Sequence, residues 1–338
     1  MKYINEEYIL TKNLYPIKQI VNDIKAGIPK KIAFLGASVT YGESVKRGRE
    51  FPAVLAKKWK EVMNTEYVPE VINASKSGTF SGNGLFAMDD LLEKKPDLVF
   101  LDYSVNDPGQ AYLAETFEAL TYRFLTAGCA VAILFFCNER GSCTKGAMTR
   151  VARHYHLPII DIGKLVMEQI SDGDITWDDF ALDYVHPNNE GHEYIADNLF
   201  RLFQIAETCD DEACGSLPEE SCFSGVFRDL QFIRELEYSE EGIELSLEFS
   251  SLLIEYTQKP EFSDYAMDVY VDGEFIRTIY RYSDFSWNNR VVHSIFEGYE
   301  NSRHNIKIVP AEKCTNSKEE WQNLKIQLAI GHFSEDSE

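Results

Sequence analysis

Basic residues are scarce in this chain of 338 residues: 33 Lys and Arg stand against 55 Asp and Glu, which gives a formal net charge of −22. Nucleic-acid binding depends on Lys and Arg that neutralise phosphates, and here they form neither a patch nor a run. The same charge disfavours anionic membrane surfaces. We therefore expect no nucleic-acid or membrane partner and a substrate that is small or neutral. A homo-oligomer is left open.

Long apolar runs are also missing. The longest, over residues 130–136, is too short to cross a bilayer. The N-terminus carries acidic residues early and lacks the unbroken apolar stretch of a signal peptide. These absences predict a cytoplasmic protein.

Cysteine is present in an odd number, seven. Cys129 and Cys137 sit in or beside apolar segments, which is typical of reduced thiols in the cytoplasm. Cys209, Cys214 and Cys222 lie closer together, but their spacing fits no zinc pattern and no fourth ligand stands nearby. We interpret them as plain thiols.

What is present is an apolar fraction of 44%, as in a packed globular protein, in a chain long enough for two domains. The first part, residues 1–206, alternates strand-like and helix-like segments, which predicts a parallel sheet covered by helices on both faces. The predicted strands cover 31–35, 70–73, 97–103, 130–136 and 157–162. The predicted helices cover 17–26, 51–63, 116–127 and 189–206.

The composition changes after residue 206. Residues 207–222 are acidic, contain Gly and Pro, and are predicted to be a solvated linker. Residues 223–338 then alternate apolar and polar positions, with a hairpin signal at Asp272-Gly273. This pattern predicts an all-β accessory domain, a sandwich or jelly roll. Its strand candidates are 243–249, 267–271, 275–280, 305–309 and 324–330.

In open parallel sheets, function gathers in the loops at the carboxyl ends of the strands. Ser38 follows the first strand at the entrance to a helix, where its hydroxyl can be presented and its N–H can face an anion. A helix cap is the alternative role for Ser38. The second strand leads into NASKSGTFSGNG, whose glycines let a backbone N–H approach a ligand, or which is simply a flexible turn.

Two further loops carry polar side chains that suit catalysis. Asn106 follows the third strand, where its amide can donate to an oxyanion, although an Asx-turn would also favour it. Asp183 and His186 precede the last helix, and the carboxylate can fix the tautomer of the imidazole so that it accepts a proton from a serine. Both could instead be ordinary surface residues. A metal bound by Asp183, His186 and His192 is a lesser alternative.

A nucleotide site is improbable on this sequence. Gly36 and Gly42 do not form G-x-G-x-x-G, no G-K-[ST] follows, and the second strand ends without an acid to bind a ribose.

Taken in order, the four blocks GASVTYG, NASKSG, DYSVND and DYVHP resemble those of the SGNH, or GDSL-like, hydrolase family. The resemblance covers roughly residues 14–206 and implies a flavodoxin-like three-layer α/β/α domain. The family's G-D-S motif is G-A-S here. The missing Asp holds no place in the catalytic triad, so its absence leaves the chemistry intact.

The resemblance implies that Ser38 is the nucleophile, His186 the general base and acid, and Asp183 the residue that orients it. It implies an oxyanion hole made of the N–H groups of Ser38 and Gly78 and the side-chain amide of Asn106. No metal or organic cofactor is expected.

From these observations we expect a serine esterase that hydrolyses short acyl esters, above all acetyl esters, on a small molecule or glycan. Family members that act on carbohydrates often carry a β-sandwich companion. One alternative is a lipase or thioesterase for longer acyl chains. Another is a non-catalytic carbohydrate-binding protein with a degenerate hydrolase domain.

Overall fold

The computed structural model describes residues 2–11, 13–107, 109–213, 215–239, 241–263, 265–284, 286, 290–312 and 324–333. Internal contacts divide the chain into two compact units, Met1–Cys222 and Phe223–Glu338. Each unit has its own buried apolar core.

The first unit contains a six-stranded sheet in the order β1-β6-β5-β4-β2-β3. Neighbouring strands run parallel except at the edge, where β1 pairs with β6 in the antiparallel direction. The central strand β4 shows why helices must cover both faces of this sheet. Its side chains alternate between the faces, and those on both faces are buried: Leu98 and Phe100 on one, Val99 and Leu101 on the other. The strands are β1 (Ile9–Leu10), β2 (Lys31–Gly36), β3 (Glu70–Asn73), β4 (Leu98–Asp102), β5 (Ala130–Phe135) and β6 (Ile159–Asp161).

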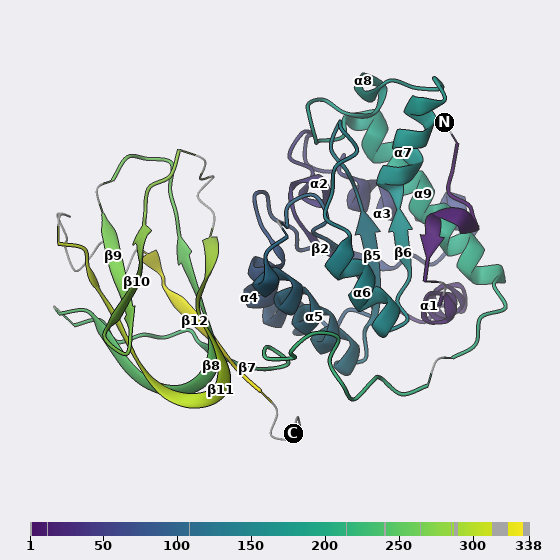
Figure 1. Ribbon diagram of the computed structural model, residues 1–338. Helices are drawn as coiled ribbons and strands as arrows, with labels where there is room; N and C mark the ends of the chain where they lie inside the picture. Colours follow the sequence, from purple (N-terminus) through teal and green to yellow (C-terminus); the bar gives the residue numbers. More distant parts are fainter. Residues whose placement is uncertain are drawn as a thin grey trace. The chain divides into compact units, whose positions relative to one another are not determined.

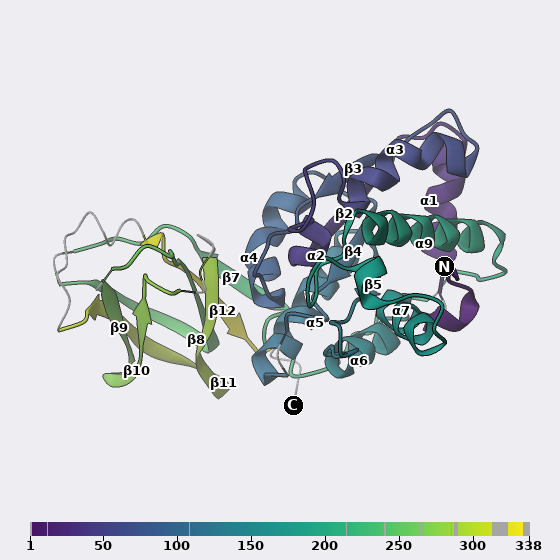
Figure 2. The same cartoon turned by 90° about the horizontal axis from the view of Figure 1, so that it is seen from above.

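Helices form a layer on each face of this sheet (Figures 1 and 2). Helices α1 (Tyr15–Lys25), α3 (Phe51–Met63) and α9 (Asn189–Thr208) pack together on one face. Helices α4 (Ser81–Leu92), α5 (Ala111–Thr126) and α6 (Gly146–His154) pack on the other. The predicted three-layer α/β/α fold is confirmed.

Shorter elements complete the unit: η1 (Glu6–Tyr8), α2 (Ser38–Tyr41), α7 (Ile162–Ser171) and α8 (Trp177–Phe180). No helix within the described ranges combines the length and apolar composition that crossing a membrane requires.

The observed elements differ from the predicted ones in places. Residues 81–84, read from sequence as the end of a glycine-rich loop, are the first turn of α4. Two of them are glycines, which disfavour helix locally, but Gly84 lies where a Cβ would meet the Tyr103 hydroxyl at 2.5 Å. Packing against Tyr103 therefore outweighs propensity. The sequence reasoning also missed α6, α7 and the edge strand β1.

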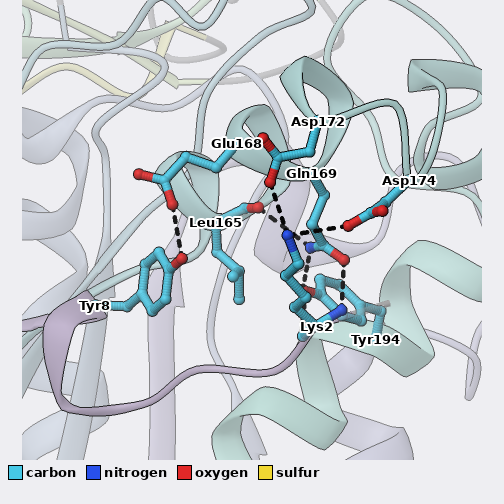
Figure 3. Close-up of polar contacts among 8 residues, drawn as sticks. All are labelled: Lys2, Tyr8, Leu165, Glu168, Gln169, Asp172, Asp174 and Tyr194. Atoms are coloured by element: carbon cyan, nitrogen blue, oxygen red, sulfur yellow. Dashed lines mark hydrogen bonds and ion pairs between the residues drawn. The ribbon is translucent and has the colours of Figure 1, made fainter.

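The N-terminal segment is fastened to the unit by a hydrogen-bonded cluster around Gln169, a fully buried residue of α7 (Figure 3). The Gln169 amide accepts from the backbone N–H of Lys2 and donates to the Tyr194 hydroxyl at 2.8 Å. Tyr194 in turn donates to the Lys2 carbonyl. Nearby, the Tyr8 hydroxyl donates to Glu168 at 2.6 Å. These contacts place β1 against β6.

The acidic stretch predicted as a linker groups with the first unit. Helix α9 extends into it, to Thr208. Asp211 accepts from the N–H of Leu14 at 2.7 Å, and the N–H of Cys222 donates to the buried carboxylate of Glu118. Most of the stretch is exposed, but these two bonds hold it against the first unit. The carboxylate of Glu118 is buried and therefore needs hydrogen-bond donors.

The second unit is all-β, as predicted, with one antiparallel six-stranded sheet in the order β10-β9-β11-β8-β12-β7. The strands are β7 (Asp229–Ile233), β8 (Ile243–Thr257), β9 (Ala266–Val271), β10 (Glu274–Tyr280), β11 (Arg290–Pro310) and β12 (Gln327–His332).

Strands β8 and β11 are much longer than the sequence pattern indicated. They bend strongly (Figure 1), and their pairing shifts register between Glu297 and Ser302. One half of β8 pairs with the end of β11, and its other half pairs with β12 and the start of β11. The bent sheet thereby encloses one core, in the manner of a sandwich, that includes Phe249, Ile306 and Leu328.

We predict that Gln169→Ala destabilises the protein by about 1–3 kcal/mol, because it removes the acceptor of the Lys2 N–H and the amide that donates to the Tyr194 hydroxyl. Denaturant unfolding measures this difference. The matched control is Gln204→Ala on α9, where the glutamine is partly exposed and accepts from Arg201 of the same helix. That change should stay within about 0.5 kcal/mol of wild type. Equal losses of unfolding free energy in both variants would show that Gln169 stabilises the protein no more than a partly exposed glutamine does.

Candidate active site

Ser38 is the first residue of α2, directly after the carboxyl end of β2. The turn between them depends on Gly36, because a Cβ there would lie 2.6 Å from the carbonyl oxygen of Asp102 on β4. Any other side chain would push the two strand ends apart. The side chain of Ser38 is mostly buried, with 8% of the residue exposed.

Asp183 and His186 lie in a closed loop between α8 and α9. Ala181 and Pro187 form an isolated antiparallel bridge across its base, and the N–H of Leu182 donates to the His186 carbonyl at 2.8 Å. The Trp177 indole N–H donates to the Asp183 carbonyl at 2.7 Å. These contacts fix the loop independently of the side chains of Asp183 and His186.

The three side chains form one hydrogen-bonded chain. His186 Nε2 lies 2.9 Å from Ser38 Oγ, and His186 Nδ1 lies 2.8 Å from Asp183 Oδ2. The other oxygen of Asp183 accepts from the N–H groups of Val185 and His186, each at 2.8 Å. Partial burial acts to raise the pKa of Asp183, but these N–H donors and the imidazole together hold it below its ordinary value. Asp183 is therefore the ionised partner of His186.

Gly78 and Asn106 come to the same edge of the sheet on the loops after β3 and β4. The loop of Gly78 is tied to the Ser38 loop, since the Lys76 N–H and the Thr79 hydroxyl both donate to the Gly36 carbonyl, at 3.1 and 3.3 Å. Gly78 has φ +67°, a left-handed conformation that favours glycine.

Three donors at this edge are left unengaged. Within the described residues, no acceptor bonds the N–H of Ser38, the N–H of Gly78 or the side-chain amide of Asn106. Ser38 begins a helix, so its N–H has no acceptor inside that helix. Donors that the protein itself leaves without an acceptor suit an anion that forms during a reaction.

Two buried carboxylates that the sequence reasoning did not single out flank Asn106. Asp102, 2% exposed, accepts from the Thr40 hydroxyl at 2.6 Å, and Asp107, 4% exposed, accepts from the Ser81 N–H at 2.9 Å. Burial raises the pKa of each to about 7, against the lowering effect of these hydrogen bonds. Both residues lie inside the block DYSVND, but the sequence alone does not reveal that they are buried.

The metal alternative fails on the position of His192. Its ring is fully buried and packs against Phe51, whose N–H donates to His192 Nδ1 at 3.3 Å. Burial lowers the pKa of His192 to about 4, helped by nearby His186, so the ring is neutral. Nowhere in the described part of the chain do three or more His, Cys, Asp or Glu side chains gather as metal ligands would.

The cysteines in the described ranges are free thiols: Cys129, Cys137, Cys143, Cys209 and Cys222. Cys214, which we interpreted as a plain thiol, lies outside the described residues. Burial raises the pKa of Cys137 to about 12, which leaves it unreactive as a thiolate.

A second Ser–His–Asp chain in the β unit shows that the pattern alone does not define a site. His304 lies 2.8 Å from the Ser302 hydroxyl and 2.6 Å from the Asp272 carboxylate. Its ring contacts Phe249 and Phe296. Ser302 lies within the β8–β11 pairing, opposite Phe249, and so does not begin a helix with an unengaged N–H. This set of hydrogen bonds holds the turn at Asp272 against β11.

The fold, together with a match to a known family, defines the class of this protein: it is a carboxylic ester hydrolase. Residues 34–194 match the model of the GDSL-like lipase/acylhydrolase family. This match lies within the first unit and confirms the predicted resemblance to this family, also called SGNH hydrolases.

No curated protein matches the chain in sequence. Among solved structures, it is similar to a two-domain esterase (CEX) active on acetylated mannans, with a TM-score of 0.78 and 21% identity over 95% of this chain and 96% of that one. The same esterase co-crystallised with mannopentaose gives a TM-score of 0.80 at 21% identity, over 98% and 99% of the two chains. An acetylxylan esterase from Geobacillus stearothermophilus is similar over 52% of this chain and 94% of its own, with a TM-score of 0.43 and 17% identity.

The buried carboxylates predict a pH-dependent stability. Asp107 has its pKa raised from 3.8 to about 7 on folding, so the folded state binds the proton more tightly. Its stabilising effect is complete below pH 3.8 and is lost as the pH rises through 7. Asp107→Asn does not titrate, so its unfolding free energy should gain about 2 kcal/mol on wild type between pH 5 and 7. Denaturant unfolding across this range tests it. A difference that stays constant with pH would mean that Asp107 is already ionised at pH 5.

Proposed function

We propose that the protein is a serine esterase that removes short acyl groups, above all acetyl groups, from a carbohydrate. The observation that carries the catalytic part is the Ser38–His186–Asp183 chain beside three unengaged hydrogen-bond donors. A nucleophile, a base and an oxyanion site are the parts that acyl transfer needs.

In the first half-reaction, Ser38 Oγ attacks the ester carbonyl carbon while His186 Nε2 takes its proton. The carbonyl oxygen becomes an oxyanion and accepts from the N–H of Ser38, the N–H of Gly78 and the amide of Asn106. As the intermediate collapses, His186 returns the proton to the leaving alcohol oxygen. The acyl group is left on Ser38.

In the second half-reaction, His186 takes a proton from water as the water oxygen attacks the acyl carbonyl carbon. The bond from that carbon to Ser38 Oγ then breaks, His186 returns the proton to Ser38 Oγ, and the acid is released. Asp183 keeps the Nδ1–H of the imidazole pointed at itself, so that Nε2 faces Ser38. Because both oxygens of Asp183 already accept hydrogen bonds, its carboxylate is held in that orientation.

The choice of substrate rests on composition and on the shared fold. The segments at the site, SKSGTFSGNG, whose last four residues begin α4, and SVNDPG, are small and polar, with no long apolar segment to line an acyl tunnel. The net charge of −22 suits a neutral sugar better than an anionic acyl carrier. A two-domain esterase active on acetylated mannans has the same fold over nearly the whole chain, which supports a glycan ester.

We extend the proposal to the β unit, where Tyr282 and Trp287 are the candidates to stack on a sugar ring. Trp287 lies outside the described residues. Tyr282 packs edge-on against Phe262, which is 81% exposed, and its hydroxyl donates to Asp284. Because Phe262 is exposed and Tyr282 is partly exposed, this aromatic pair suits sugar stacking.

We predict that Ser38→Ala reduces turnover of p-nitrophenyl acetate by about 10⁴-fold or more while the protein stays folded. The matched control is Ser302→Ala, which breaks the second Ser–His–Asp chain and should leave turnover unchanged. Initial rates and circular dichroism measure both. If Ser38→Ala kept near wild-type turnover, Ser38 would not be the nucleophile.

Acyl-chain selectivity distinguishes this proposal from the lipase or thioesterase alternative. We expect kcat/KM to fall from p-nitrophenyl acetate to butyrate to octanoate, and an acetylated oligosaccharide to exceed a simple alkyl acetate, because binding energy from the sugar lowers the barrier. Preference for octanoate would support a lipase. No turnover of any ester by the folded protein would support the non-catalytic binding protein.

A further inference from the structure

The helix that carries Ser38 lacks a cap of its own. Its N-cap residue is Ala37, in an extended conformation (φ −98°, ψ −152°) with no side-chain hydrogen bond. A carboxylate at an N-cap accepts from the N–H of the second or third helical residue. The family motif G-D-S would place a carboxylate at this position, and G-A-S does not.

A carboxylate from a neighbouring strand bonds the first turn of this helix instead. Thr40 is the third residue of α2, and its hydroxyl donates to the carboxylate of Asp102, at the end of β4. The hydroxyl bond is 2.6 Å long, as short as charge-assisted bonds are. The Asp102 carbonyl also accepts from the Ala37 N–H at 3.1 Å. Asp102 therefore contacts α2 on both sides of Ser38.

Asp102 also directly precedes the loop that carries Asn106. The Asn106 N–H donates to the carbonyl of Tyr103, the residue after Asp102, at 3.1 Å. One buried side chain thus joins the start of the Asn106 loop to the helix of the nucleophile. A shift of either loop would move an oxyanion donor relative to the Ser38 hydroxyl.

We propose that Asp102 is a positioning residue of the active site, which caps α2 from β4 and takes the place of the carboxylate missing from position 37. The proposal rests on the proposed function, since it concerns the Ser38 nucleophile and the oxyanion donors. Asp102 fixes the positions of Ser38 and Asn106 relative to each other and does not itself touch the substrate. Its loss should lower kcat far more than it raises KM, because the oxyanion exists only in the transition state.

A rescue experiment tests whether a carboxylate at position 37 can take over the role of Asp102. Asp102→Ala should lower kcat for p-nitrophenyl acetate by about 10- to 100-fold, as a small misplacement of reacting groups does, with KM changed less than about threefold. Adding Ala37→Asp supplies a local cap in the space that Asp102 vacates and should restore at least about tenfold of kcat. Ala37→Asp alone places two carboxylates in one buried site and should give no gain.

Normal kcat in folded Asp102→Ala, or a double variant no faster than the single one, would overturn the proposal. If Asp102→Ala does not fold, the other end of the bond gives the same test. Thr40→Val removes the hydroxyl at nearly constant shape and should lower kcat with KM little changed, whereas Thr40→Ser keeps the hydroxyl and should retain kcat. Equal kcat in the valine and serine variants would also overturn it.

Two controls separate positioning from general stability and from the proposed function. Glu118→Gln alters another buried carboxylate, one that accepts from the Tyr155 hydroxyl at 2.7 Å, and should lower stability without lowering kcat. A loss of kcat in that variant equal to the loss in Asp102→Ala would mean that Asp102 acts through stability alone. Ser38→Ala reports on the function: if it stays active, the proposed function fails, whereas an inactive Ser38→Ala beside a fully active Asp102→Ala rejects the positioning role alone.

Discussion

Gly36 and Asp102 lie against each other at the carboxyl ends of β2 and β4, with so little space that a Cβ on residue 36 would sit 2.6 Å from the Asp102 carbonyl oxygen. The rest of the site follows from this close approach. It brings the Ala37 N–H to the Asp102 carbonyl and the Thr40 hydroxyl to its carboxylate. It also leaves the Gly36 carbonyl to accept from the Gly78 loop. Three separate loops thereby become one surface.

A second close approach brings the histidine to this surface. Ser38 and His186 are 148 residues apart in the chain. The N-terminus of α9 packs against the last residue of α8 so tightly that a Cβ on Gly191 would lie 2.0 Å from the Phe180 carbonyl oxygen. The helix start thus fixes the loop that ends at Pro187. Small residues at both contacts let main chains meet, and backbone packing therefore sets the geometry of the proposed triad.

The β unit offers an instructive contrast. Ser302, His304 and Asp272 are hydrogen-bonded in the same order and at similar distances as the proposed triad. Ser302, however, belongs to a strand, where ladder pairing engages the backbone, whereas Ser38 begins a helix with an unengaged N–H. The structural network and the proposed active site therefore differ in the hydrogen-bond donors that are available to an oxyanion.

The sequence by itself determined the layered α/β domain, the all-β domain and the four loops that carry Ser38, Gly78, Asn106 and the Asp183–His186 pair, because apolar periodicity and motif order are local properties. Only the tertiary structure decided which alternatives hold. His192 reads as a ligand in sequence but packs against Phe51, and α4 forms despite its glycines because it packs against Tyr103. The role of Asp102 also depends on the fold. Burial and the partner of a carboxylate are set by strands distant in sequence, so no local pattern reveals them.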